Sequence, residues 1–199
     1  MAFAIPEGLA PEVYPLAWLL GTWRGPGFLA YPNIPERPFV QEATFGHDGG
    51  PYLSYTSTIW LLDEEAAEAS RGETDEPSST EVRYSAGPVW AAESGYWRPA
   101  PGAAAEPGDE PSVDLEVLLA EPTGHVSVYL GTVQGPRIEI ATDLVARTST
   151  AAEIAAVRRM YGLVGGELMW ATDMAAFGHE MRPYASARLA RVPATGAQG

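Results

Sequence analysis

The stretch Val113-Asp-Leu-Glu-Val-Leu-Leu119 is the clearest guide to the fold, because apolar and acidic side chains alternate along it. In an extended strand, successive side chains point to opposite faces of the sheet. The apolar residues that share one face are Val113, Leu115, Val117 and Leu119. The acidic residues Asp114 and Glu116 take the other face. One face of this strand is therefore predicted to be buried and the other to meet water.

The same alternation recurs downstream, each time after a turn rich in glycine or proline. Three series carry it: Val126, Val128 and Leu130 after Pro122-Thr-Gly124; Ile138 and Ile140 after Gly135-Pro136; and Leu168, Trp170, Thr172 and Met174 after Gly165-Gly166. Alternating runs joined by such turns predict antiparallel hairpins.

Further short runs rich in β-branched and aromatic residues predict more strands. They lie at 21–31, 39–46, 52–62, 82–86, 90–98 and 182–191, which brings the total close to ten. A consecutive series of this length tends to close on itself, because closure removes unpaired edges. We therefore expect an all-β, closed, antiparallel ten-stranded barrel. Residues 11–20 are expected to form a short helical turn that plugs one end.

The length of 199 residues fits one domain spanning the whole chain. Two acidic segments lack large apolar residues in most of their length and are predicted to be surface loops, at about 63–80 and 99–111. A flexible tail is expected after about residue 192.

Composition excludes several classes of function. The formal net charge of −14 argues against nucleic acids and anionic membranes as partners, because both bind through clustered basic side chains. The absence of cysteine excludes disulfides, thiolate metal sites and cysteine nucleophiles. No signal segment or apolar stretch long enough to span a bilayer is present, so a cytoplasmic protein is expected. Whether it is a monomer or a homodimer stays open.

No familiar catalytic or metal-binding motif is present. His179-Glu180 begins like a zinc-binding HExxH helix, but Pro183 occupies the place of the second histidine. His47 is expected at a strand end, as a turn residue. His125 and His179 are expected in exposed turns. We therefore predict no catalytic residues and no metal site.

The segment Gly21-Thr-Trp23-Arg-Gly25-Pro-Gly27 resembles the GxWxGxG signature of the nitrobindin family. In structural terms, Trp23 is expected to close the barrel floor, while Gly25 and Gly27 relieve crowding between strands. Further segments similar to the family follow in order along nearly the whole chain: 31–34, 42–47, 51–55, 93–97, 120–124, 146–150 and 173–176.

The resemblance implies a ten-stranded barrel related in form to lipocalins and fatty-acid-binding proteins. Nitrobindins hold haem b in the barrel mouth through one histidine, which follows a proline on the last strand, and keep the iron ferric for nitric oxide and peroxynitrite chemistry. The equivalent dipeptide here is Pro183-Tyr184, so a phenol replaces the imidazole. A phenol must lose a proton with a pKa near 10 before it ligates iron.

Three functions follow from this replacement. The favoured one is a non-enzymatic binder of a small apolar ligand, with no cofactor and with Tyr184 lining the pocket. One alternative is a ferric haem protein that uses Tyr184 as axial ligand and acts on nitric oxide or peroxynitrite. The other is an interaction module whose barrel is filled by its own side chains. Candidate pocket residues are Thr44, His47, Arg147, Trp170 and Met174, and Arg147, Arg158 and Arg159 are candidate partners for a ligand carboxylate.

Overall fold

The computed structural model describes residues 6–62, 86–102 and 112–193. The predicted loop at 63–80, residues 103–111 of the second predicted loop, and the tail from residue 194 lie outside these ranges. Among the described residues, no helix is long and apolar enough to cross a bilayer.

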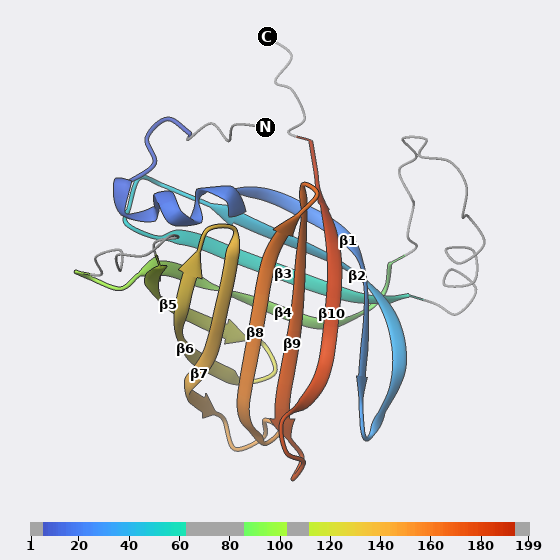
Figure 1. Ribbon diagram of the computed structural model, residues 1–199. Coiled ribbons are helices and arrows are strands. Elements are labelled where there is room, and N and C mark those ends of the chain that lie inside the picture. Colours follow the sequence, from blue (N-terminus) through green and yellow to red (C-terminus); the bar gives the residue numbers. More distant parts are fainter. Residues whose placement is uncertain (1–5, 63–85, 103–111, 194–199) are drawn as a thin grey trace.

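Ten antiparallel strands form a closed barrel, as predicted (Figure 1). Each strand pairs with its neighbours in sequence, and β1 pairs with β10 to close the sheet. The elements are η1 (Pro11–Leu19), β1 (Gly21–Tyr31), β2 (Ile34–Gly46), β3 (Leu53–Leu62), β4 (Ala86–Pro99), β5 (Ser112–Glu121), β6 (His125–Gln134), β7 (Arg137–Arg147), β8 (Ile154–Val164), β9 (Glu167–Ala176) and β10 (Arg182–Arg191).

The structure describes ten strands, which matches the predicted count of about ten, although not every strand is an expected one. The strand expected at 90–98 lies within β4, and the strand expected at 82–86 lies outside the described residues except for Ala86, where β4 begins. Strand β8 was not expected at all. Its sequence places Arg158 and Arg159 side by side, so it lacks the simple apolar alternation that identifies a strand with one wet face.

The inward faces of β5, β7 and β9 are those that the alternation predicts. In β6 the faces are reversed: Val126 and Leu130 are exposed, whereas His125, Ser127 and Tyr129 point inward and are buried. A barrel interior that lines a cavity accepts polar side chains, so apolar character alone does not mark the inner face there.

The 3₁₀ helix η1 lies across one end of the barrel (Figure 1), where it contacts β4 and β6. Trp23 is fully buried beneath it, and its indole nitrogen donates a hydrogen bond to the Leu19 carbonyl oxygen at 2.7 Å. The guanidinium of Arg191 lies 4.1 Å from the centre of the Trp23 ring. This end of the barrel is therefore closed by packing, as the sequence predicts.

Gly25 and Gly27 allow β1 to cross its neighbours at close range. A Cβ atom at Gly25 would overlap the backbone carbonyl oxygen of Arg188 on β10. A Cβ atom at Gly27 would overlap the Phe39 ring and the Ser186 carbonyl oxygen. The glycines of the motif thus serve the fold, because no larger residue fits at either position.

Candidate functional site

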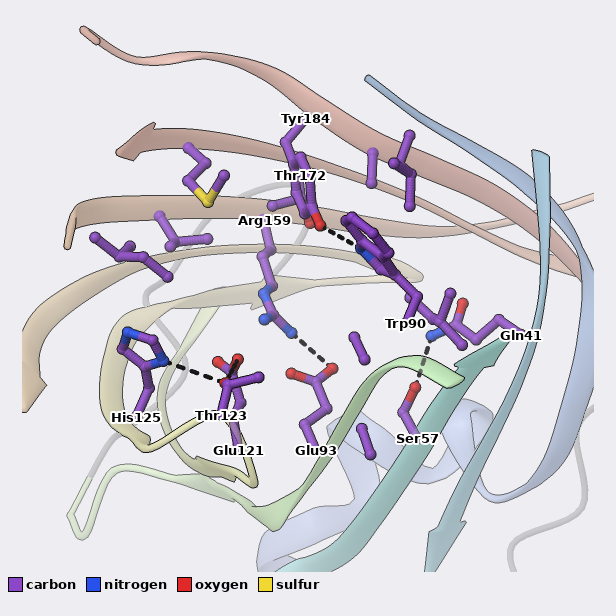
Figure 2. Close-up of a pocket in the computed structure, with 18 of the residues that line it drawn as sticks. Gln41, Ser57, Trp90, Glu93, Glu121, Thr123, His125, Arg159, Thr172 and Tyr184 are labelled. Carbon is purple, nitrogen blue, oxygen red and sulfur yellow. Dashed lines mark hydrogen bonds and ion pairs between the residues drawn. The ribbon is translucent and has the colours of Figure 1, made fainter. Parts of the chain in front are cut away.

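A cavity of about 310 Å³ occupies the half of the barrel away from η1. Strand β1 leaves η1 at Gly21, and only its far part, at Leu29, reaches the cavity wall. The volume lies at the lower end of the range for small-molecule sites, about 300–1,000 Å³. Figure 2 shows the polar and aromatic side chains that face this space.

Tyr184 reaches the cavity because β10 is irregular at this residue. Pro183 pairs with Asp173 and Ala185 pairs with Thr172, which leaves Tyr184 as an extra residue in β10. Such a bulge re-aims a side chain and lets consecutive residues share a face. Tyr184 and Ala185 therefore both line the cavity, although strict alternation would send them to opposite sides.

The Tyr184 hydroxyl is held inside the cavity by a second aromatic residue. The indole Nε1 of Trp90, on β4, donates a hydrogen bond to the Tyr184 oxygen at 2.8 Å. Burial raises the pKa of Tyr184 above its usual value, and the Trp90 hydrogen bond opposes that shift only in part. Tyr184 is therefore a neutral phenol at ordinary pH.

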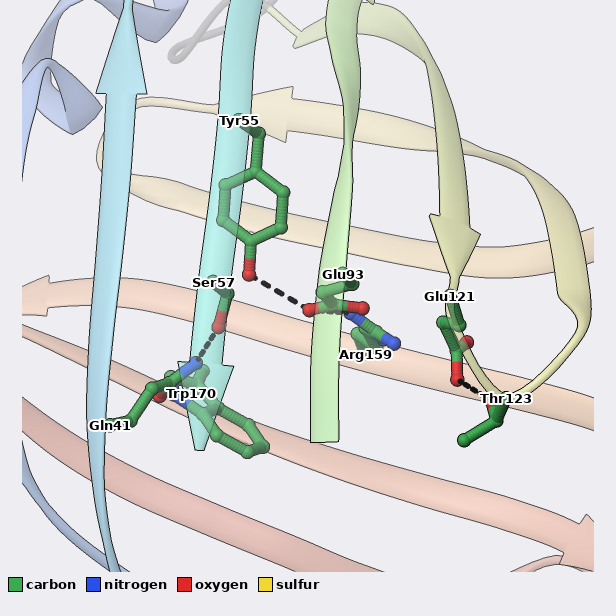
Figure 3. A network of polar contacts seen from close by, with 8 residues as sticks. All are labelled: Gln41, Tyr55, Ser57, Glu93, Glu121, Thr123, Arg159 and Trp170. Carbon is green, nitrogen blue, oxygen red and sulfur yellow. Dashed lines mark hydrogen bonds and ion pairs between the residues drawn. The ribbon is translucent and has the colours of Figure 1, made fainter. Parts of the chain in front are cut away.

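A buried ion pair crosses the cavity between β4 and β8 (Figure 3). Arg159 Nη1 lies 2.9 Å from Glu93 Oε1, and the two side chains are only 12% and 14% exposed. The Tyr55 hydroxyl donates a second hydrogen bond to the same Glu93 oxygen at 2.9 Å. The Arg159 guanidinium also lies 5.1 Å from the centre of the Tyr129 ring. These contacts fix both charges in the barrel interior.

A second carboxylate, Glu121, lines the same cavity at the end of β5. The Thr123 hydroxyl donates to Glu121 Oε2 at 3.4 Å. Burial raises the pKa of Glu121, and the negative charge of Glu93 raises it further. Together, Glu93 and Glu121 give the cavity two carboxylates beside one guanidinium.

His125 also belongs to this wall, which corrects the expectation that it is exposed. It is 3% exposed because the faces of β6 are reversed relative to the prediction. Its Nδ1 lies 3.2 Å from the Thr123 hydroxyl, and its Nε2 lies 2.9 Å from the Ala152 carbonyl oxygen. Both ring nitrogens are thus engaged with the protein.

A short hydrogen-bonded chain orders the opposite part of the cavity. Trp170 Nε1 donates to Gln41 Oε1 at 2.6 Å, and Gln41 Nε2 donates to the Ser57 hydroxyl at 2.8 Å (Figure 3). All three residues line the cavity. Because their polar atoms satisfy one another, this wall presents mainly the apolar surface of the Trp170 ring to a ligand.

The structure brings together only some of the pocket residues expected from the sequence. Trp170, Met174 and Tyr184 line the cavity. Thr44 instead lies 3.1 Å from Thr22, hydroxyl to hydroxyl, in the η1 half of the barrel.

Two other expected residues also lie outside the cavity lining. His47 follows the end of β2 and has a buried Nδ1 without a hydrogen-bond partner. Arg147 donates to the Ala151 carbonyl oxygen at 3.3 Å, at the connection between β7 and β8.

Of the three arginines considered as partners for a ligand carboxylate, only Arg159 lines the cavity. Arg158 points outward and pairs with Asp173 at 2.8 Å. Sequence reasoning missed Trp90, Glu93 and Glu121. The sequence signal for Glu93 is its place on a predicted strand. Because both faces of that strand carry polar residues, the sequence does not tell whether Glu93 points into the barrel or toward solvent.

The described residues hold no group of three or more His, Asp or Glu side chains suited to a metal ion. What the cavity offers is an apolar and aromatic surface with a few fixed polar groups. Such a surface suits one small, mostly apolar molecule.

Comparisons with known proteins agree with this architecture. The family described as THAP4-like, heme-binding beta-barrel domain matches residues 12–191. A protein of Beutenbergia cavernae named ferric nitrobindin-like protein is 61% identical over 216 residues, which covers 96% of this chain and 100% of that protein. A protein of Leifsonia xyli subsp. xyli named peroxynitrite isomerase is 40% identical over 214 residues, which covers 94% of this chain and 98% of that protein.

The solved structures include a similar barrel. The crystal structure of Rv2717c from M. tuberculosis superposes with a TM-score of 0.69 at 29% identity, covering 92% of this chain and 99% of that one. The match to the family extends from η1 to the last residue of β10, and so includes the whole barrel. The chain therefore belongs to the nitrobindin family of THAP4-like, haem-binding β-barrel domains.

Proposed function

We propose that the chain is a non-enzymatic member of this family that binds one small, mostly apolar molecule and has lost family-type haem ligation. The observation that carries the proposal is the Trp90–Tyr184 hydrogen bond of 2.8 Å inside the cavity. At the position that the resemblance assigns to the haem-ligating histidine, the chain holds a neutral phenol that is engaged with a neighbouring indole.

The residues of the cavity fit haem poorly. Ligation by Tyr184 requires a phenolate, and burial raises the pKa of this group. His125 offers no free nitrogen, because both ring nitrogens contact protein oxygen atoms. Haem b also carries two propionates, whereas Glu93 and Glu121 place negative charge in the cavity and Arg159 is paired with Glu93.

The cavity walls support a small apolar ligand instead. The apolar and aromatic residues that line it come from six strands and from the turn after β9: Leu29, Ile34, Ile59, Trp90, Ile154, Val157, Tyr161, Trp170, Met174 and Phe177. Burying apolar surface is worth about 25 cal/mol per Å², so such walls can supply most of the affinity for a molecule of this size. The open volume also favours a binder over a barrel that is filled by its own side chains.

Relatives named peroxynitrite isomerase make a haem-dependent enzyme the second candidate. That name belongs to those proteins, and the family resemblance implies that such an activity would use ferric haem. Its extension to this chain depends on tyrosinate ligation, which the raised pKa of Tyr184 disfavours. We therefore favour a binder of a small apolar molecule over a haem-dependent enzyme.

The test combines native mass spectrometry of the purified chain with binding of N-phenyl-1-naphthylamine, a neutral apolar dye that fluoresces when shielded from water. We expect a retained small molecule or saturable dye binding at one site per chain. Ala185→Phe, which fills the cavity wall, should abolish dye binding. The matched control is Ala190→Phe, on the exposed face of the same strand. Equal dye binding by both variants, with no retained molecule in the wild type, would exclude an internal ligand site.

A further inference from the structure

We propose that the cavity prefers a ligand with a protonated amine over a neutral or carboxylate-bearing ligand of the same shape. This inference rests on the proposed function and specifies the chemical class of its ligand. It follows from the distribution of charge, aromatic surface and hydrogen-bonding capacity around the cavity.

The charged side chains that line the cavity do not cancel. They are Glu93, Glu121 and Arg159. Arg159 forms an ion pair with Glu93 at 2.9 Å, and the Tyr55 hydroxyl donates a hydrogen bond to the same Glu93 oxygen. Glu121 therefore leaves an excess negative charge facing the interior, where water screens it less than at the surface.

Glu121 also retains hydrogen-bonding capacity that the protein does not use. An ionised carboxylate can accept about four hydrogen bonds. The side-chain contact it makes is with the Thr123 hydroxyl, at a long 3.4 Å. Both burial and the nearby Glu93 charge disfavour its ionised form, and a ligand ammonium group would offset both effects.

Aromatic rings complete an environment suited to a cation with an apolar body. Trp90 and Tyr184 line the same cavity as Glu93 and Glu121 (Figure 2), and Trp170 forms another part of its wall. The faces of such rings attract cations, most strongly those of tryptophan. The same chemistry already operates within the barrel, where the Arg159 guanidinium lies over the Tyr129 ring.

A ligand carboxylate finds no equivalent partner. It would share Arg159 with Glu93 and would lie beside the negative charges of Glu93 and Glu121. Arg159 Nε has no hydrogen-bond partner, but this atom is itself buried, so a ligand in the cavity does not reach it. The arrangement therefore discriminates by charge as well as by shape.

The test is isothermal titration calorimetry with 2-phenylethylamine, 2-phenylethanol and phenylacetate, which differ mainly in their polar group. We expect the amine to bind about tenfold more tightly than the alcohol, because it gains a charge-assisted hydrogen bond. Phenylacetate should bind more weakly than the alcohol. In Glu121→Gln the amine should lose about tenfold in affinity while the alcohol is unaffected. Asp114→Asn removes one negative charge from the exposed face of the same strand and should leave all three affinities unchanged.

Equal affinity of the amine and the alcohol for the wild-type chain would overturn the inference, whatever the behaviour of the variants. An amine preference that persists in Glu121→Gln would also overturn the role assigned to Glu121. If the alcohol and N-phenyl-1-naphthylamine bind but the amine has no advantage, only this inference fails. If none of these molecules binds, the proposed function fails with it.

Discussion

Replacing Arg159 with methionine should destabilise the barrel by about 3 kcal/mol. The Arg159 and Glu93 side chains are 12% and 14% exposed, and their charged atoms are 2.9 Å apart. The substitution keeps most of the side-chain volume but leaves the Glu93 carboxylate inside the barrel without its cation. Breaking a buried ion pair costs about 3–5 kcal/mol, and the lower end applies because the cavity admits solvent. At about 2–4 °C per kcal/mol, the Tm should fall by roughly 6–12 °C.

Urea unfolding followed by tryptophan fluorescence measures this cost, and scanning calorimetry gives the change in Tm. The control is Arg24→Met, which breaks the Arg24–Glu42 pair on the outer surface, where both side chains are 41% exposed, and should cost less than about 1 kcal/mol. The double variant Arg159→Met/Glu93→Gln removes both charges of the pair and should recover much of the lost stability. If Arg159→Met costs no more than Arg24→Met, Glu93 does not depend on Arg159 for its place inside the barrel.

Three further predictions concern single residues. Gly25→Ala should destabilise the chain by about 1–3 kcal/mol, because its Cβ overlaps the β10 backbone, whereas Gly162→Ala, whose nearest neighbouring atom is 3.8 Å away, should be close to neutral in the same urea assay. Tyr184→Phe should cost about 1 kcal/mol, because the Trp90 indole loses its acceptor, and no change in the urea midpoint would contradict that role. Burial raises the pKa of Tyr161 to about 12, so the native state keeps a proton that the unfolded chain loses near pH 10. The free energy of unfolding should therefore be unaffected below about pH 10 and fall by about 2–3 kcal/mol by pH 12. Urea unfolding across this range should show a weaker decline for Tyr161→Phe, and an identical decline would argue against this source.

The fold was largely predictable because most of its strands carry their own signals. The expected bounds 21–31 and 182–191 are those of β1 and β10. The bounds of β1 follow from the glycine and tryptophan spacing and from the turn after Tyr31. The bounds of β10 follow from the last apolar run of the chain. Strand β8 escaped prediction because the adjacent residues Arg158 and Arg159 break the period, although Arg158 points to solvent and Arg159 to the cavity.

The site was less predictable, because a cavity reverses the usual rule that inward side chains are apolar. His125 and Glu121 lie at strand ends, and because both are polar the sequence predicts that they face solvent. In the structure both line the cavity. The position of Tyr184 depends on the bulge in β10, and no residue in Arg182-Pro-Tyr184 specifies that bulge from sequence alone. Pairing across the barrel, such as that between Glu93 and Arg159, depends on closure and has no local signature.

We propose that this nitrobindin barrel keeps the internal cavity without family-type haem ligation. A haemin titration followed by visible absorption tests it on the wild-type chain, Tyr184→Phe and Tyr184→His. We expect the wild type and Tyr184→Phe to behave alike and to form no stoichiometric haem complex. Tyr184→His, which restores the ligand that the resemblance implies for the family, should bind haemin more tightly than either. A stoichiometric complex of the wild type with a phenolate-to-iron charge-transfer band, lost in Tyr184→Phe, would contradict this proposal.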